Sequence, residues 1–464
     1  MNSYKTPNVY IEEIAKASPS VAEVSTAFPA FMGYTEKAEE NGKNLIHIPT
    51  RINNFLEYQE YFGGPAHFEF LITASEATET VTIDSESTLK YILYHSLEFY
   101  FSNGGGPCMI ISTGNYSENP SKEDYISALN ALSKQDEPTL ILLTDAIYNV
   151  SKDDYYELVQ IALAQCENLK DRFTILDVLS DDKDGSEFRQ GIGTENLKYG
   201  AAYYPFLITD FKPSYTEESV QITLEFKPTT TESGNIITPL PEQMSLGDFV
   251  KVNNALYEKA KTLLNQQSLI LPPSPSMAGI YAQMDRNYGV WRPPANINVA
   301  SVVDLTAKLD NQAQEAFNID AASGKSINII RSFKHEGIAV WGARTLAGND
   351  NNWRYISVRR LFNNIEVSIR QATRFAVFEP NNATTWIKVK AMIDSYLYGL
   401  WKQRALLGQT RREAYFVNIG LGSSMTQQDI LEGRLNVDIG IAAVRPAEFI
   451  ILKFSHKLQE SISS

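Results

Sequence analysis

The stretch "PTLILLTDA" at residues 138–146 is a short apolar run that reads as a buried β-strand. A helical pattern, "DDYYELVQIALAQCENL" (153–169), separates it from a second buried strand, "DRFTILDVLSD" (171–181). A third run of this kind, "YGAAYYPFLITDF", occupies residues 199–211. Strands that alternate with helices are typical of βαβ units. The middle of the chain is therefore predicted to be an α/β domain.

Two acidic residues in this domain suggest an enzyme as an alternative function. Asp145 and Asp177 lie near the carboxyl ends of their strands, where open α/β sheets place active sites, so a metal-dependent hydrolase is conceivable. Aspartates at strand ends also serve as helix caps and turn formers. Cys108 lies in the turn "NGGGPC", but no histidine partner for a nucleophile can be named. The five histidines lack metal-ligand spacing: His47, His67, His95, His335 and His456.

The run "ASGKS" at residues 322–326 raises the question of a phosphate-binding loop. Such a loop needs a glycine five positions before Gly324, and Ile319 stands there. A β-branched residue resists the positive φ that a phosphate nest requires. The following "SINIIRSF" alternates like a strand, whereas a phosphate-loop lysine opens a helix. Lys325 is therefore not predicted to bind a phosphate, and the run needs another explanation.

Bulk composition limits the classes of protein further. With 464 residues, 43% of them hydrophobic and 11% aromatic, the chain is long enough for two or three folded domains. Two cysteines, Cys108 and Cys166, indicate no disulfide framework. No secretory signal and no apolar run of membrane-spanning length is visible, so direct membrane insertion is not expected. A net charge of -14 disfavours nucleic acid as the main partner.

The segment 351–420 is basic within this acidic chain. Its eleven Lys and Arg residues against four acids give +7, so the remainder carries -21. A helix is predicted over Val358–Phe378, with one apolar arc formed by Val358, Leu361, Phe362, Ile365, Ile369, Ala372 and Ala376. Four cations fall on a neighbouring arc: Arg359, Arg360, Arg370 and Arg374. They predict either a surface that meets an acidic partner or a strip neutralised by acids of the subunit itself or a neighbouring one.

The two ends of the chain carry strand patterns without an obvious partner. A second helix, capped by Thr384 or Thr385, is predicted after the first, followed by the strands "AYFVNIG" (414–420) and "LNVDIGIAAV" (435–444). Leu435, Val437, Ile439 and Ile441 share one face of the latter, and "EFIILKFSH" (448–456) is apolar on both faces. At the other end, "PNVYIEEI" (7–14), with Val9 and Ile11, precedes a polar tether. Each strand either packs on its own domain or extends a neighbour's sheet.

Several ordered blocks resemble the contractile tail sheath proteins of bacteriophages and related injection systems. They are "TPNVYIEEI" (6–14), residues 25–64 ending in "YFGG", "TLKYILYHSLEFYFSNGGGPCMIIST" (88–113), the run 318–346 ending in "WGARTL", and residues 351–382. The resemblance covers roughly residues 5–115 and 285–460. Residues 66–88 and 213–245, rich in Thr, Ser and Glu, match less well and are expected to be surface decoration.

The resemblance implies a multidomain α+β and α/β fold, with an inner α+β domain built from the C-terminal region plus the N-terminal strand. It implies an N-terminal arm (1–22), an N-terminal part of the sheath domain (23–115), a middle and outer α/β domain (116–344) and an inner C-terminal domain (345–464). Val9, Ile11, Leu435, Val437, Ile439 and Ile441 would lie in strands exchanged between subunits. The four arginines would face an inner tube.

By the same resemblance, the function is mechanical and no enzyme activity or cofactor is implied. The subunit would polymerise and contract to drive the tube through a target envelope. Sheath paralogues, baseplate and terminator proteins are further expected partners. Synthesis in the bacterial cytoplasm and incorporation into a phage tail or tail-like particle are expected.

Overall fold

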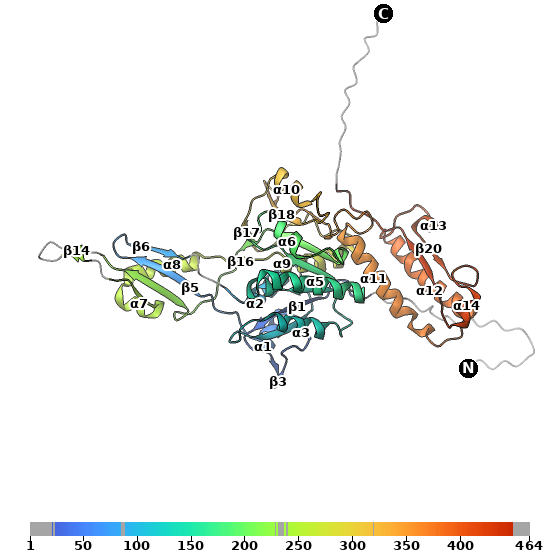
Figure 1. The fold of residues 1–464 in the computed structure, drawn as a ribbon, viewed down its shortest axis with the longest axis horizontal. Coiled ribbons are helices and arrows are strands. Elements are labelled where there is room, and N and C mark those ends of the chain that lie inside the picture. The colour runs from blue at the N-terminus through green and yellow to red at the C-terminus, as the bar shows by residue number, and fades with distance from the viewer. Residues whose placement is uncertain are drawn as a thin grey trace, which may run out of the picture. The chain divides into compact units, whose positions relative to one another are not determined.

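The computed structural model describes residues 21, 24–84, 89–227, 229–230, 236–237, 240–318 and 320–448 (Figure 1). Within these residues the chain forms two compact units. The larger unit holds residues 25–363 and 445–448, and the smaller unit holds residues 21, 24 and 364–444. The expected N-terminal arm with Val9 and Ile11, and the strand expected over 448–456 except for Glu448, lie outside the described residues.

The larger unit is built on an eight-stranded sheet with the order β19-β18-β10-β9-β8-β1-β7-β4. Its strands are β1 (Pro29–Thr35), β4 (Thr50–Ile52), β7 (Cys108–Asn115), β8 (Leu140–Leu143), β9 (Phe173–Asp177), β10 (Gly200–Tyr204), β18 (Asn328–Phe333) and β19 (Gly337–Val340). All pairs from β18 to β7 are parallel, and the two edge strands are antiparallel to their neighbours. The predicted βαβ architecture is therefore present.

Alternating side chains of this sheet bury against helices on both faces. Met32 and Ile141 pack on the side of α3 (Lys122–Leu132) and α5 (Lys152–Leu169). On the other side, Phe31 and Leu142 pack with α1 (Phe55–Phe62), α2 (Leu93–Ser102) and α9 (Ser274–Tyr288). Residues from β1 and β8 share these cores, so the expected division between 23–115 and 116–344 does not separate two compact units.

The two regions expected as surface decoration form a sheet with a core of its own. The order is β15-β12-β5-β6, from β5 (Phe70–Ser75), β6 (Thr80–Ile83), β12 (Val220–Glu225) and β15 (Glu242–Ser245). Phe70, Ile222 and Leu256 lie in its core, which α7 (Leu246–Val252) and α8 (Asn254–Gln266) complete. Because β5 and β12 pair in parallel, two weakly matching segments of sequence build one lobe.

The remaining elements of the larger unit are short. They are β2 (Glu39–Glu40), β3 (Lys43–Asn44), α4 (Ala146–Asn149), α6 (Ser186–Gly191), η1 (Leu197–Tyr199), β11 (Leu207–Thr209), β13 (Thr229–Thr230), β14 (Ile236–Ile237), β16 (Ile270–Leu271), β17 (Val302–Leu305) and α10 (Asn311–Asn318). No helix among the described residues has both the length and the apolarity needed to cross a bilayer.

Helix α11 (Ile356–Ala372) carries the chain from the larger unit into the smaller one. The helix predicted over 358–378 ends earlier, at Ala372. There the Thr373 hydroxyl donates to the Ile369 carbonyl oxygen (2.8 Å), a contact that weakens helical backbone bonding. A 3₁₀ turn, η2 (Thr373–Ala376), follows. Phe378 then has a φ of 69°, which no helix accommodates.

The smaller unit continues with α12 (Ala383–Lys402), α13 (Arg411–Ala414), β20 (Tyr415–Asn418), α14 (Gln427–Leu431) and β21 (Asp438–Ile441). The cap of α12 is Asn382 rather than Thr384 or Thr385. Its side-chain oxygen accepts from the backbone N–H groups of both threonines, at 3.0 and 3.1 Å. Asn382 is a stronger capping residue than threonine, and it fixes the start of the helix two or three residues earlier than a cap at Thr384 or Thr385 would.

Candidate assembly surfaces

The strand-end aspartates hold helices rather than lining an active site. Asp145 is fully buried, and its carboxylate accepts from the backbone N–H groups of Tyr34 (2.7 Å) and Ile92 (2.8 Å), at the start of α2. Asp177 accepts from the backbone N–H (2.7 Å) and the hydroxyl (2.5 Å) of Ser274, the first residue of α9. Burial raises the pKa of each carboxyl to about 7. Both residues therefore tie a helix N-terminus to the sheet, as caps do.

The other residues considered for chemistry are also structural. Lys325 is buried, its amine donates to the backbone carbonyl oxygen of Arg189, and burial lowers the pKa of this amine. Strand β18 follows it where a phosphate loop would begin a helix. Burial raises the pKa of the Cys108 thiol well above its usual value, which disfavours the reactive thiolate. Among the described residues, no group of three or more His, Cys, Asp and Glu could hold a metal ion.

The predicted strip of four arginines is corrected, because Arg359 and Arg360 are buried. Arg360 forms a bidentate ion pair with Asp285 of α9 (3.0 and 2.5 Å), donates to the Thr26 carbonyl oxygen (2.9 Å) and lies over the Tyr281 ring. These contacts fasten the first turns of α11 within the larger unit.

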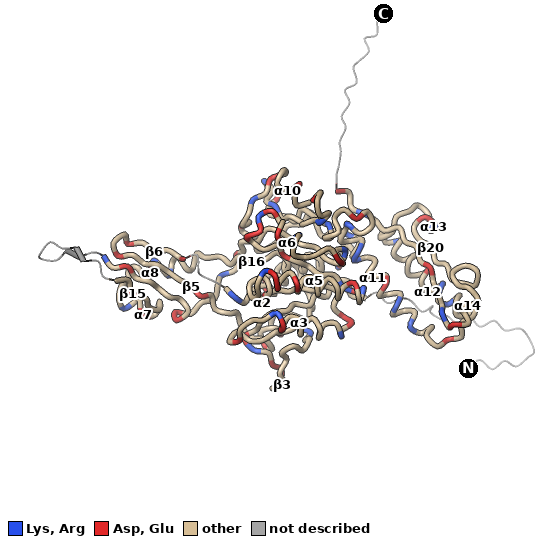
Figure 2. Tube along the Cα trace, viewed as in Figure 1, with Lys and Arg blue, Asp and Glu red and all other residues tan. Residues whose placement is uncertain are grey.

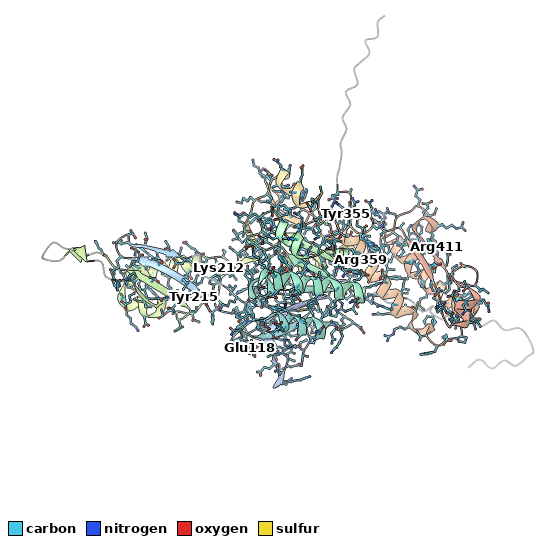
Figure 3. All side chains as sticks on the ribbon, viewed as in Figure 1. Glu118, Lys212, Tyr215, Tyr355, Arg359 and Arg411 are labelled. Carbon is cyan, nitrogen blue, oxygen red and sulfur yellow. The ribbon has the colours of Figure 1, made fainter. Side chains whose placement is uncertain are left out.

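Arg359, which is labelled in Figure 3, belongs to α11. It lies on the aromatic ring of Trp353 at 4.3 Å and donates to Asn363 at 2.8 Å. Arg359 and Arg360 are thus enclosed within the subunit and do not form part of its surface. The helical pattern could not show this, because Asp285 and the aromatic partners lie elsewhere in the sequence.

Arg370 and Arg374 are exposed, in contrast to the other two arginines. They lie in the last turn of α11 and in η2, inside the smaller unit, where Figure 2 marks the cations in blue. Large apolar side chains that sequence patterns did not single out are exposed on the same turn: Phe375, Val377 and Phe378. The exposed part of the predicted strip is therefore half as large as expected and adjoins an apolar turn.

The C-terminal strand pattern also has a different place from the one expected. Ile439 and Ile441 do not leave their own domain, because β21 pairs antiparallel with β20, with Ile439 opposite Val417 and Ile441 opposite Tyr415. Leu435 and Val437 lie just before β21 and are half-buried. Position in the sequence could not show this, because the partner strand lies some twenty residues upstream. Ile439 and Ile441 therefore belong to a sheet of the smaller unit, and Leu435 and Val437 lie in the segment that leads into it.

This two-stranded sheet has open edges among the described residues. Ala442 donates to Ala414 and accepts from Leu407, so both of its backbone groups point to the side of β20. Because the direction of these groups alternates along a strand, those of Ile439 and Ile441 point to the opposite edge. Among the described residues no strand pairs with that edge, so it can offer donors and acceptors to another strand.

Comparison with known proteins identifies the family. A chain of the PVC sheath complex of an extracellular contractile injection system, solved in the contracted state, is 30% identical in sequence to this chain. The match covers 98% of this chain and 99% of that chain, with a TM-score of 0.66. The chain belongs to the contractile sheath family. The family model of the phage tail sheath C-terminal domain matches residues 348–457. The resemblance found in the sequence is thereby confirmed.

Two further relatives agree with this assignment. The helical sheath of the anti-feeding prophage in its contracted state is 28% identical over 98% of this chain and 100% of that chain, with a TM-score of 0.66. The tail sheath protein of Enterobacteria phage T4 is 27% identical over 129 residues, which are 28% of this chain and 19% of the phage protein. Sheath proteins are structural, so the hydrolase alternative has no support.

Proposed function

We propose that this chain is the subunit of a contractile sheath that polymerises around an inner tube and drives it through a target envelope. The observation that carries the proposal is the likeness, over nearly the whole chain, to a chain of a contracted sheath complex. Synthesis takes place in the bacterial cytoplasm, and the working place is a phage tail or tail-like particle. Other sheath proteins, a baseplate and a terminator complete the set of proposed partners.

Neighbouring subunits are linked by strand addition to the β20–β21 sheet. The N-terminal segment with Val9 and Ile11, and the residues after Glu448, are the strands supplied by neighbours. The open edge at Ile439 and Ile441 supports this arrangement, because an edge with unpaired backbone groups readily accepts a further strand. Main-chain hydrogen bonds hold such a strand in register while the subunits reorient.

The inner tube is contacted through the smaller unit, by Arg370 and Arg374. Both arginines are exposed on a basic segment of an otherwise acidic chain, so an acidic tube surface is their natural partner. Exposed ion pairs contribute only about 0–1 kcal/mol each. Contacts of that strength hold an extended sheath on its tube and break when the sheath contracts.

The test is assembly of the purified protein, followed by negative-stain microscopy and sedimentation. The wild type is expected to form regular hollow cylinders, and a variant lacking residues 1–15 is expected to stay folded and soluble without forming them. Ile439→Pro removes an N–H at the open edge and should also prevent assembly. Ile439→Ala is the matched control, since it keeps this N–H and should assemble.

Normal cylinders from both the truncated protein and Ile439→Pro would refute the strand-exchange arrangement. A wild type that forms no cylinders and remains a small oligomer would refute the sheath function itself.

A further inference from the structure

Glu448, the last residue that the structure describes, is held by four hydrogen bonds from three separate segments of the larger unit. Arg344 donates through Nε to Oε1 (2.8 Å) and through Nη2 to Oε2 (2.6 Å). Asn318, at the end of α10, donates to Oε1 (3.0 Å), and the Tyr355 hydroxyl donates to Oε2 (3.2 Å). Both carboxylate oxygens are therefore occupied twice. We call Glu448, Arg344, Asn318 and Tyr355 the Glu448 clamp.

The clamp is largely withdrawn from water. The side chain of Arg344 is 3% exposed and that of Glu448 is 22% exposed. Burial by itself would raise the pKa of Glu448, but the hydrogen bonds from Arg344 and Asn318 outweigh it and lower the pKa below its usual value. Glu448 is thus ionised at neutral pH, and the bidentate geometry gives the pair a defined direction.

Arg344 is in turn fixed to the central sheet. Its backbone N–H donates to Asn328 Oδ1 and its carbonyl oxygen accepts from Asn328 Nδ2, both at 2.8 Å. Asn328 is the first residue of β18, and its Nδ2 also donates to the Ala202 carbonyl oxygen of β10 (3.2 Å). A continuous chain of hydrogen bonds therefore runs from Glu448 through Arg344 to two strands of the eight-stranded sheet. It also gives the arginine of the "WGAR" pattern a physical role.

We propose that Glu448 anchors the C-terminal arm and passes the pull of a neighbouring subunit into the central sheet. This inference rests on the proposed function, in which the residues after Glu448 pair with the next subunit. Any force on that arm meets Glu448 before it reaches β21. Four donors that converge on one carboxylate resist such a force together, whereas the four residue pairs between β20 and β21 would open one after another.

The decisive experiment removes the ion pair without leaving a buried charge. Glu448→Gln alone leaves the Arg344 guanidinium buried without its counter-ion and lowers the stability of the subunit. The double variant Arg344→Gln/Glu448→Gln has no buried charge, so the melting temperature of the unassembled subunit is expected to recover most of that loss. Tyr355→Phe removes a single hydrogen bond and leaves the ion pair in place. Glu432→Gln, at the exposed pair with Arg434, is the matched control.

Three quantities are measured for each variant: the melting temperature of the unassembled subunit, the fraction of protein in cylinders, and the survival of cylinders under shear. If Glu448 is the anchor, the double variant has about tenfold less protein in surviving cylinders than the wild type, even though its melting temperature recovers. Tyr355→Phe shows a smaller loss of the same kind at an unchanged melting temperature. Glu432→Gln behaves as the wild type.

The proposal is overturned if cylinder survival recovers together with the melting temperature, because the clamp would then act only on the fold. If the double variant does not fold, the test rests on Tyr355→Phe. Tyr355→Phe cylinders that resist shear as well as those of the wild type overturn the proposal. A wild type that forms no cylinders refutes the sheath function and with it the anchor.

Discussion

The buried pair between Arg360 and Asp285 provides the sharpest test of how α11 is held. Both side chains are almost fully enclosed, at 3% and 4% exposure. Asp285→Ala leaves the guanidinium without its counter-ion, and removal of one partner of a buried pair costs about 3–5 kcal/mol. Asp285→Asn keeps one acceptor oxygen, while the Thr26 carbonyl and the Tyr281 ring remain, so its effect should be smaller.

The expected change in melting temperature follows from the size of the larger unit. With an unfolding entropy of roughly 2.1 cal/mol/K per residue over residues 25–363, 1 kcal/mol corresponds to about 1.4 °C. Asp285→Ala should therefore lower the melting temperature by about 4–7 °C. The matched control is Glu137→Ala, at the exposed pair between Arg51 and Glu137 of the same unit, whose side chains are 49% and 56% exposed. That pair is worth about 0–1 kcal/mol, so a shift near or below 1 °C is expected.

The assay is thermal unfolding of the unassembled subunit, followed by tryptophan fluorescence. Trp353 is a local reporter, since Arg359 lies on its ring and Phe362 packs against it. Equal shifts for Asp285→Ala and Glu137→Ala would refute the reasoning, because burial would then add nothing to the value of the ion pair.

Two further predictions concern the tube contact and pH. Arg370→Glu/Arg374→Glu should weaken the binding of the extended sheath to its tube and alter the salt sensitivity of this binding, while contracted cylinders still form. Co-sedimentation of sheath with tube is the measurement, and normal assembly around the tube would show that these arginines are not the tube-binding surface. Burial raises the pKa of Asp177 from 3.8 to about 7, so between these pH values the folded state holds a proton that the unfolded state releases. The free energy of unfolding should therefore fall as the pH rises from about 4 to about 7, by up to about 1.4 kcal/mol per pH unit. Urea unfolding of Asp177→Asn across this range should show a flatter decline, and an unchanged slope would contradict the assignment.

The α/β core could be predicted from the sequence because its signals are local. The runs at 138–146 and 171–181 are apolar throughout, and they became β8 and β9 with α5 between them. Ile319 and the alternating run after Lys325 were sufficient to reject a phosphate loop. The resemblance to sheath proteins, carried by ordered blocks, was confirmed over nearly the whole chain.

The errors arose where a long-range partner decides the outcome. A helical wheel placed Arg359 and Arg360 on a polar arc, but whether an arginine on that arc is exposed depends on Asp285, which lies 75 positions before Arg360. In the same way, alternation placed Ile439 and Ile441 in a strand but could not show that β20 pairs with it. The Glu448 clamp joins Glu448 to residues 93 to 130 positions earlier in the chain, so no local pattern indicates it.

The division between buried and exposed cations matches what a contracting lattice requires. Arg344 and Arg360 are enclosed and bidentate, so breaking either pair costs several kcal/mol, about as much as a large destabilising mutation. Arg370 and Arg374 are exposed, and any pair they form across an interface is worth about 0–1 kcal/mol. A force that grows gradually during contraction therefore breaks the surface contacts long before it reaches the internal ones. If that ordering holds, subunits can exchange one set of neighbours for another while each fold stays intact, and the Glu448 clamp, being internal, should survive contraction.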